Sequence, residues 1–166
     1  MTGAVAEIAG PQRRLSREAK IGVVAVGTVI ATRILLGNFV VNEWEGWSVF
    51  IPTAIGAVIE GLVLGGLVFG LLVRIAARGR GARPGVTALV VGVLAILSLA
   101  IPYSAPQVIL GAAAVALGLA AVERGDNGRR ARLGRAGIAL GSLVIVTWTA
   151  FMGFAIATGD WPVGGG

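Results

Sequence analysis

The chain has 166 residues, of which 56% are hydrophobic and 13% charged, and its mean hydropathy is +0.89. Soluble domains carry about 25% charged residues, and a soluble domain of this size could not remove so much apolar surface from water. The chain has no cysteine and no histidine, which excludes disulfides, metal sites built from these residues, and catalysis by Ser-His or Cys-His pairs. The composition therefore predicts an integral membrane protein.

Five long apolar runs follow a polar cytoplasmic tail, residues 1–20. Each run is close to the roughly 17 to 25 residues that cross about 30 Å of hydrocarbon as an α-helix rising about 1.5 Å per residue. We therefore predict an all-α, polytopic membrane bundle with one transmembrane domain, residues 21–158, and an external tail, residues 159–166. The predicted spans are 21–41, 49–73, 86–103, 106–122 and 136–158.

Lysine and arginine collect in segments that lie on one side of these spans. The amino-terminal tail holds four, the 74–85 connection four and the 123–135 connection five of the 14 basic residues. The opposite connections carry acidic residues, tryptophan and tyrosine, but no basic residue. The positive-inside rule then predicts a cytoplasmic amino terminus and an external carboxyl terminus, in a multi-pass protein of a bacterial plasma (inner) membrane. Juxtamembrane arginines account for the net charge of +6 without a nucleic-acid partner.

Two segments are similar enough to indicate an internal repeat. Residues 58–92 and 108–141 both begin with V-I-x-G, pass through R-G and A-R-x-G elements, and continue into an apolar run that contains A-L and a glycine. Each copy would form a hairpin of two spans, and the pair would be parallel repeats of the kind found in some transporters. Chance similarity between Gly-, Ala-, Leu- and Val-rich segments is the alternative.

Two charged residues fall in the middle of predicted spans, Arg33 in the first and Glu60 in the second. A lone charge at the bilayer centre costs about 2.5 to 3.5 kcal/mol on insertion scales. A short connection makes these two helices antiparallel neighbours, and counting from their outer ends places the two residues at similar depth. We therefore predict that Arg33 pairs with Glu60. Three hydroxyl residues at similar predicted depth would complete this intramembrane polar site: Thr32, Ser98 and Thr147.

This pair has two interpretations. In the first, it is a bridge that holds the first helix against the second and has no part in turnover. In the second, it is a polar site at the midplane that binds a headgroup, a quinone or a solute, or carries a proton on Glu60.

Glycines spaced four residues apart predict close helix contacts, because a missing side chain lets two backbones approach. Internal packing is the preferred interpretation and homo-oligomer formation the alternative. The residues are Gly61, Gly65, Gly66 and Gly70 on the second span, with Gly137 and Gly141 on the fifth.

The first two predicted spans contain residues at spacings that resemble the DoxX-like family of small membrane subunits. An arginine and a glycine four apart mark the first helix of that family, and a glutamate, glycines and a terminal arginine mark the second. The matching residues are Arg33, Gly37, Glu60, Gly70 and Arg74. The resemblance implies a subunit associated with quinone-linked oxidoreductases, although family members have four helices. Residues 86–156 also look like small actinobacterial membrane proteins of unknown function, which implies no activity.

No catalytic residue, metal site or required cofactor is predicted, because no nucleophile with a base, phosphate-binding loop or ligand cluster is visible. The first function hypothesis is a noncatalytic accessory or scaffold subunit that contacts the lipid bilayer and other membrane subunits. The second is a small transporter or channel whose midplane site contains Arg33 and Glu60. The third is a quinone-handling subunit of a redox complex, so a quinone or lipid stays open as a ligand.

Overall fold

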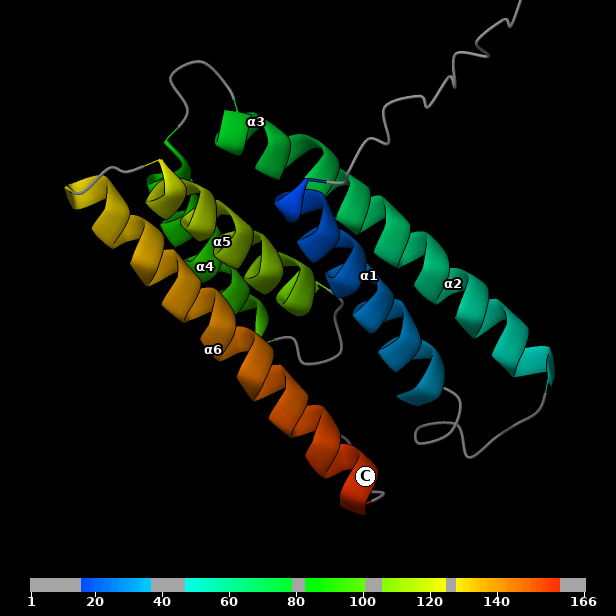
Figure 1. Ribbon diagram of the computed structural model, residues 1–166. Coiled ribbons are helices and arrows are strands. Elements are labelled where there is room, and N and C mark those ends of the chain that lie inside the picture. Colours follow the sequence, from blue (N-terminus) through cyan, green and yellow to red (C-terminus); the bar gives the residue numbers. More distant parts are fainter. Residues whose placement is uncertain (1–15, 37–46, 79–82, 101–105, 125–127, 159–166) are drawn as a thin grey trace, which may run out of the picture.

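The computed structural model describes residues 16–36, 47–78, 83–100, 106–124 and 128–158, and all secondary structure in these ranges is helical (Figure 1). The elements in chain order are α1 (Arg17–Leu36), α2 (Trp47–Gly65), η2 (Gly66–Val73), α3 (Arg74–Arg78), α4 (Pro84–Ser98), α5 (Pro106–Glu123) and α6 (Arg129–Thr158). The predicted all-helical bundle is therefore confirmed.

Three helical stretches are long and apolar enough to cross a membrane: Phe50–Ala77, Pro106–Glu123 and Arg129–Ala155. The helix Pro84–Ser98 is apolar but shorter. Residues 37–41 of the first predicted span and 101–103 of the third lie outside the described residues. The same holds for residues 1–15 of the predicted amino-terminal tail and for the predicted external tail, residues 159–166.

The second predicted span belongs to a longer helical rod made of α2, η2 and α3. These elements have 19, 8 and 5 residues and follow one another without a break. At about 1.5 Å per residue the rod is about 48 Å long, which exceeds the roughly 30 Å of hydrocarbon in a bilayer. Its middle segment, η2, is a π-helix, a form that is rare and frequently occurs at functional sites. Arg74 and Arg78 therefore end a helix, whereas the sequence analysis placed them in a connection.

α6 begins before the fifth predicted span. Residues 123–135 are predicted to connect two spans, and the helix already begins at Arg129 within this connection. Four arginines lie within its first seven residues, although positive charge is unfavourable at a helix amino terminus. Tertiary packing compensates for this charge, because Ala131 and Gly134 are buried and Gly134 lies against Ala121 of α5.

α1 begins four residues before its predicted start. The hydroxyl oxygen of Ser16 accepts a hydrogen bond of 3.3 Å from the backbone N–H of Ala19. A serine in this position caps a helix by satisfying one of its free N–H groups. The cap accounts for a helix that starts at Arg17 rather than at the first apolar residue.

α5 forms the centre of the bundle. It contacts α4 and α6, which also contact each other, and it contacts α1 on another side (Figure 1). Most of its residues are buried, including Ile109 and Leu117. α5 is rich in alanine and glycine, so neighbouring backbones approach it closely. A methyl group added at Gly118 would be 2.5 Å from the carbonyl oxygen of Gly134 on α6.

α1 joins the central helix to the α2–η2–α3 rod, and it contacts both. Val29 is buried against Val108 and Ile109 of α5, with Leu64 and Phe69 of the rod packed beside them. α1 therefore lies against both the rod and α5, and the rod also contacts α5 directly through η2, α3 and α2 (Figure 1).

The two segments of the proposed repeat do not form equivalent hairpins. In the second segment, α5 and α6 are in extensive contact. In the first segment, the rod meets α4 chiefly through the short helix α3. The shared sequence pattern therefore produces two different helix arrangements.

Candidate functional site

The two charged residues that the sequence analysis paired are in contact. Arg33 on α1 donates a hydrogen bond from Nη2 to Oε2 of Glu60 on α2, and the two atoms are 2.7 Å apart. The side chains remain 44% and 31% exposed. The pair therefore lies at the periphery of the bundle, between two helices that face the surrounding medium, rather than in an enclosed interior site.

Two glycines beside Glu60 bring α1 and α2 together. A methyl group at Gly61 would be 2.7 Å from Cγ1 of Ile30, and one at Gly65 would collide with Val26. Ile30 lies one turn before Arg33 on α1, so the contact sets the helix separation next to the ion pair. Gly61 and Gly65 therefore lie at the close contact between α1 and α2.

The other four predicted packing glycines divide into two groups. A methyl group at Gly137 would be 2.6 Å from Ala88 of α4, and one at Gly141 would collide with the carbonyl oxygen of Gly111 on α5, so both glycines lie at close helix contacts. Gly66 and Gly70 have no neighbouring atom within 4 Å of the position of an added methyl group. Gly66 and Gly70 therefore lie at no close helix contact within the described part of this chain.

The predicted hydroxyl residues do not complete the site. Thr32 donates its hydrogen bond to the Thr28 carbonyl, and Ser98 donates to the Ala95 carbonyl, both at 2.7 Å within their own helices. Thr147 is exposed on α6. Depth in the membrane does not fix which way a helix face points, and a hydroxyl in apolar surroundings can bond to the preceding turn of its own helix.

The structure reveals a buried polar contact that the sequence analysis missed. Gln107, at the start of α5, is fully buried, and its Nε2 donates a 3.0 Å hydrogen bond to the carbonyl oxygen of Ser98 at the end of α4. The sequence feature that could have indicated this contact is a polar residue directly after Pro106 and before a long apolar run. The bond joins the ends of two adjacent helices.

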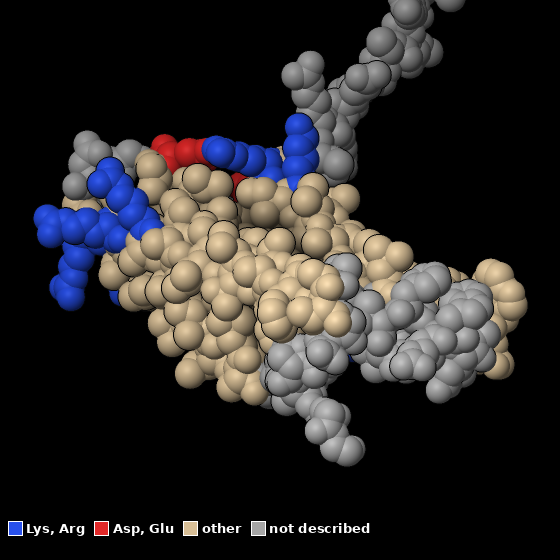
Figure 2. All heavy atoms as spheres, turned by 90° about the horizontal axis from the view of Figure 1, so that it is seen from below, with Lys and Arg blue, Asp and Glu red and all other residues tan. Residues whose placement is uncertain are grey.

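The arginine-rich end of the bundle has its own contacts. Arg17 of α1 forms an ion pair with Glu123 of α5, and Arg124 donates to the carbonyl oxygen of Ala77 on α3. These contacts join α1, α3 and α5 at one end. Figure 2 shows Lys and Arg gathered at one end and along the adjoining edge of the visible face, while the rest of its described surface is almost entirely uncharged.

A groove of about 620 Å³ runs between α1 and the rod. Apolar residues and glycines line most of it, and neither Arg33 nor Glu60 is among its lining residues. No group of three or more Asp or Glu side chains that could hold a metal ion occurs among the residues that the structure describes. The ion pair and the groove are therefore separate features of the same helix pair.

The fold defines a helical bundle with three helices long and apolar enough to cross a membrane. Comparisons with protein-family models, with curated proteins and with solved structures found no match. Of the residues that carry the DoxX-like resemblance, Arg33 and Glu60 form the ion pair, Gly70 and Arg74 line the groove, and Gly37 lies outside the described residues.

Proposed function

We propose that the chain is a five-span protein of a bacterial plasma membrane that acts as a noncatalytic accessory or scaffold subunit. In this proposal the Arg33–Glu60 pair fixes the first helix against the second, and the rod presents a surface to a membrane partner. The single observation that carries the proposal is a row of exposed aliphatic side chains along the rod.

This row, the aliphatic ridge, places a large branched residue at every fourth position, and each is more than half exposed: Ile51, Ile55, Ile59, Val63, Leu67, Leu71 and Ile75. Residues four apart form the ridges that fit into the grooves of a neighbouring helix. Within a bilayer the hydrophobic effect does not drive helices together, so complementary packing decides association. A regular ridge that has few contacts in its own chain supports a partner helix.

Copurification tests this role. We expect a stoichiometric membrane partner to copurify with the tagged protein in mild detergent, and the combined changes Ile59→Ala, Val63→Ala and Leu67→Ala to reduce its yield at least fivefold. The matched control is Leu143→Ala with Val146→Ala on α6, because these side chains are also more than half exposed. Both variants should retain the thermal stability of the parent. Equal partner yields from the two variants would contradict docking at the ridge.

The transporter hypothesis would place Arg33 and Glu60 in a water-filled midplane site. The exposure of both side chains at the bundle surface, and their absence from the lining of the groove, favour the accessory role. A partner-free protein that moves protons or solute in liposomes would reverse this preference. The quinone hypothesis rests on the DoxX-like resemblance, and bound quinone extracted from the purified protein would support it.

The proposed orientation is directly testable because the chain contains no cysteine. Single cysteines can be introduced by Ser48→Cys near the predicted outer end of α2 and by Gly128→Cys beside α6, and both positions are exposed. We expect a membrane-impermeant maleimide to label the first in intact cells and the second only after permeabilisation. The opposite labelling pattern would reverse the topology.

A further inference from the structure

The groove between α1 and the rod extends along only part of both helices. It is lined from Ser16 to Ile30 on α1, 14 residue steps of about 1.5 Å each, so it is about 21 Å long. Its lining ends at Ile30 and Leu62, beside the contact between Ile30 and Gly61. Starting at the arginine-rich end, the groove therefore covers about half of the roughly 40 to 45 Å thickness of a bilayer with its headgroup regions, which corresponds to one leaflet.

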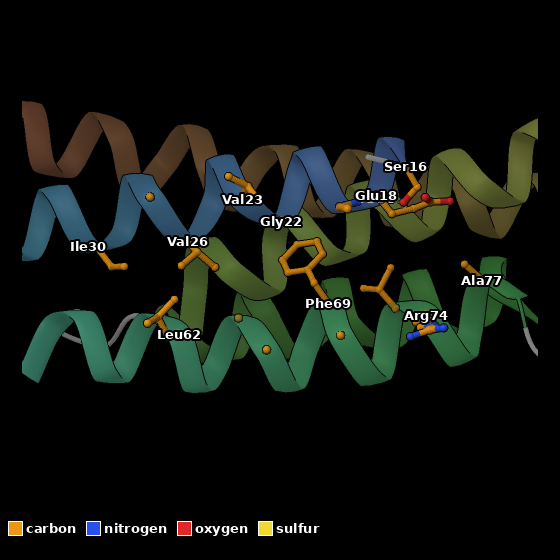
Figure 3. Close-up of a pocket in the computed structure, with 16 residues that line it drawn as sticks. Ser16, Glu18, Gly22, Val23, Val26, Ile30, Leu62, Phe69, Arg74 and Ala77 are labelled. Carbon is orange, nitrogen blue, oxygen red and sulfur yellow. Dashed lines mark hydrogen bonds between the residues drawn. The ribbon is translucent and has the colours of Figure 1, made fainter. Parts of the chain in front are cut away.

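The interior of the groove is apolar, and its width results from missing side chains. Val23, Val26 and Leu62 line it, and the Phe69 ring lies between the two helices towards Gly22 (Figure 3). Three other glycines that line the groove have no neighbouring atom within 4 Å of an added methyl group: Gly27, Gly66 and Gly70. An aliphatic chain would therefore contact branched side chains on its flanks and glycine along its floor.

One end of the groove is polar. Ser16 and Glu18 from α1 and Arg74 from the rod lie at this end, away from Ile30 and Leu62 (Figure 3). The Arg74 side chain is exposed and belongs to neither the Arg17–Glu123 nor the Arg33–Glu60 ion pair. A guanidinium group binds phosphate oxygens through two parallel N–H donors, which a lysine could not do.

We propose that this groove holds an acyl chain of a phospholipid from the cytoplasmic leaflet, with the lipid phosphate bound to Arg74. The occupant must be apolar over about one leaflet and anionic at the end nearest Arg74, which describes a phospholipid. A transmembrane partner helix fits less well, because it would continue through the outer leaflet, whereas the lining of the groove ends at Ile30 and Leu62. The inference rests on the proposed membrane orientation and is independent of the proposed partner.

Two variants separate the headgroup from the acyl chain. Arg74→Gln removes the phosphate-binding group, and its matched control is Arg132→Gln, an exposed arginine of α6 that does not line the groove. Gly70→Leu places a side chain in the groove, and no atom lies within 4 Å of its Cβ position. Its control is Gly56→Leu on α2, which is equally unobstructed and outside the groove.

Native mass spectrometry of the full chain in detergent, titrated with dioleoyl phosphatidylglycerol, provides the measurement. We expect one lipid per chain to bind more tightly than the rest, at least fivefold weaker binding in Arg74→Gln and Gly70→Leu, and unchanged binding in both controls. Inorganic phosphate should not displace this lipid. Thermal melting of every variant in the same detergent should show that the fold is retained.

Equal losses in Arg74→Gln and Arg132→Gln would overturn the site in favour of general charge attraction. Unchanged binding in Gly70→Leu would show that the acyl chain lies elsewhere, and displacement by inorganic phosphate would show an anion site without a lipid. Conversion of a dimer to a monomer by Gly70→Leu would assign the groove to a second copy of this chain. Copurification measured on the same variants keeps the accessory role separate, because a retained partner with lost lipid affects this proposal alone.

Discussion

Glu60→Leu alone should destabilise the protein more than Arg33→Leu and Glu60→Leu together. In a helix that we propose spans the membrane, the single change leaves the Arg33 guanidinium without the carboxylate that lies 2.7 Å from it. An unpaired arginine at the centre of a span costs about 2.5 to 3.5 kcal/mol on insertion scales. Removing one partner of a charge pair in a low-dielectric setting is in general worse than replacing both with apolar groups. We expect the double variant to recover most of the loss.

Thermal melting of the parent, both single variants and the double variant in one detergent gives the coupling free energy of the pair. The Arg17–Glu123 pair supplies a control, because its side chains are 61% and 56% exposed at the end of the bundle. Exposed ion pairs contribute about 0 to 1 kcal/mol, so Arg17→Gln should change the melting temperature little. Equal and additive losses from Arg33→Leu and Glu60→Leu would show that the pair does not hold the two helices together.

Gly141→Leu should prevent the α4–α5–α6 bundle from forming. Even a methyl group at this position would collide with the backbone carbonyl oxygen of Gly111, and Ala114 and Val115 surround the same space. Overpacking a well-packed core costs about 1 to 3 kcal/mol when side chains can move aside. Here the obstacle is the backbone of the central helix, so the cost should exceed that range.

Gly153→Leu is a matched control on the same helix, because nothing lies within 4 Å of its added methyl position. Size-exclusion chromatography of detergent extracts is the measurement. The control should elute as a single symmetrical peak at the yield of the parent, and Gly141→Leu should aggregate or disappear. A well-behaved Gly141→Leu protein would mean that α5 and α6 do not approach as closely as the structure shows.

The sequence by itself determined the helical fold and the partner of its two mid-span charges. Long apolar runs identify helices because every backbone polar group must be satisfied within the segment in lipid. The Arg33–Glu60 contact was predictable because the chain connects these two helices directly, and because an isolated charge in a span is expensive. Both inferences depend on the position of a residue along the chain and on its depth in the membrane, and both quantities can be counted from the sequence.

Only the tertiary structure decided which faces meet. Gly61 and Gly66 are the same type of residue and lie five positions apart, yet Gly61 packs against Ile30 whereas Gly66 borders an open groove. Thr32, Ser98 and Thr147 share a predicted depth but bond within their own helices or remain exposed. In a bundle that is apolar on all sides, burial leaves little trace in the pattern of hydrophobic residues. The rotation of each helix about its axis is set by side-chain packing against helices that are distant in the sequence. α5 shows this most clearly, because other helices surround it and it has no single apolar face.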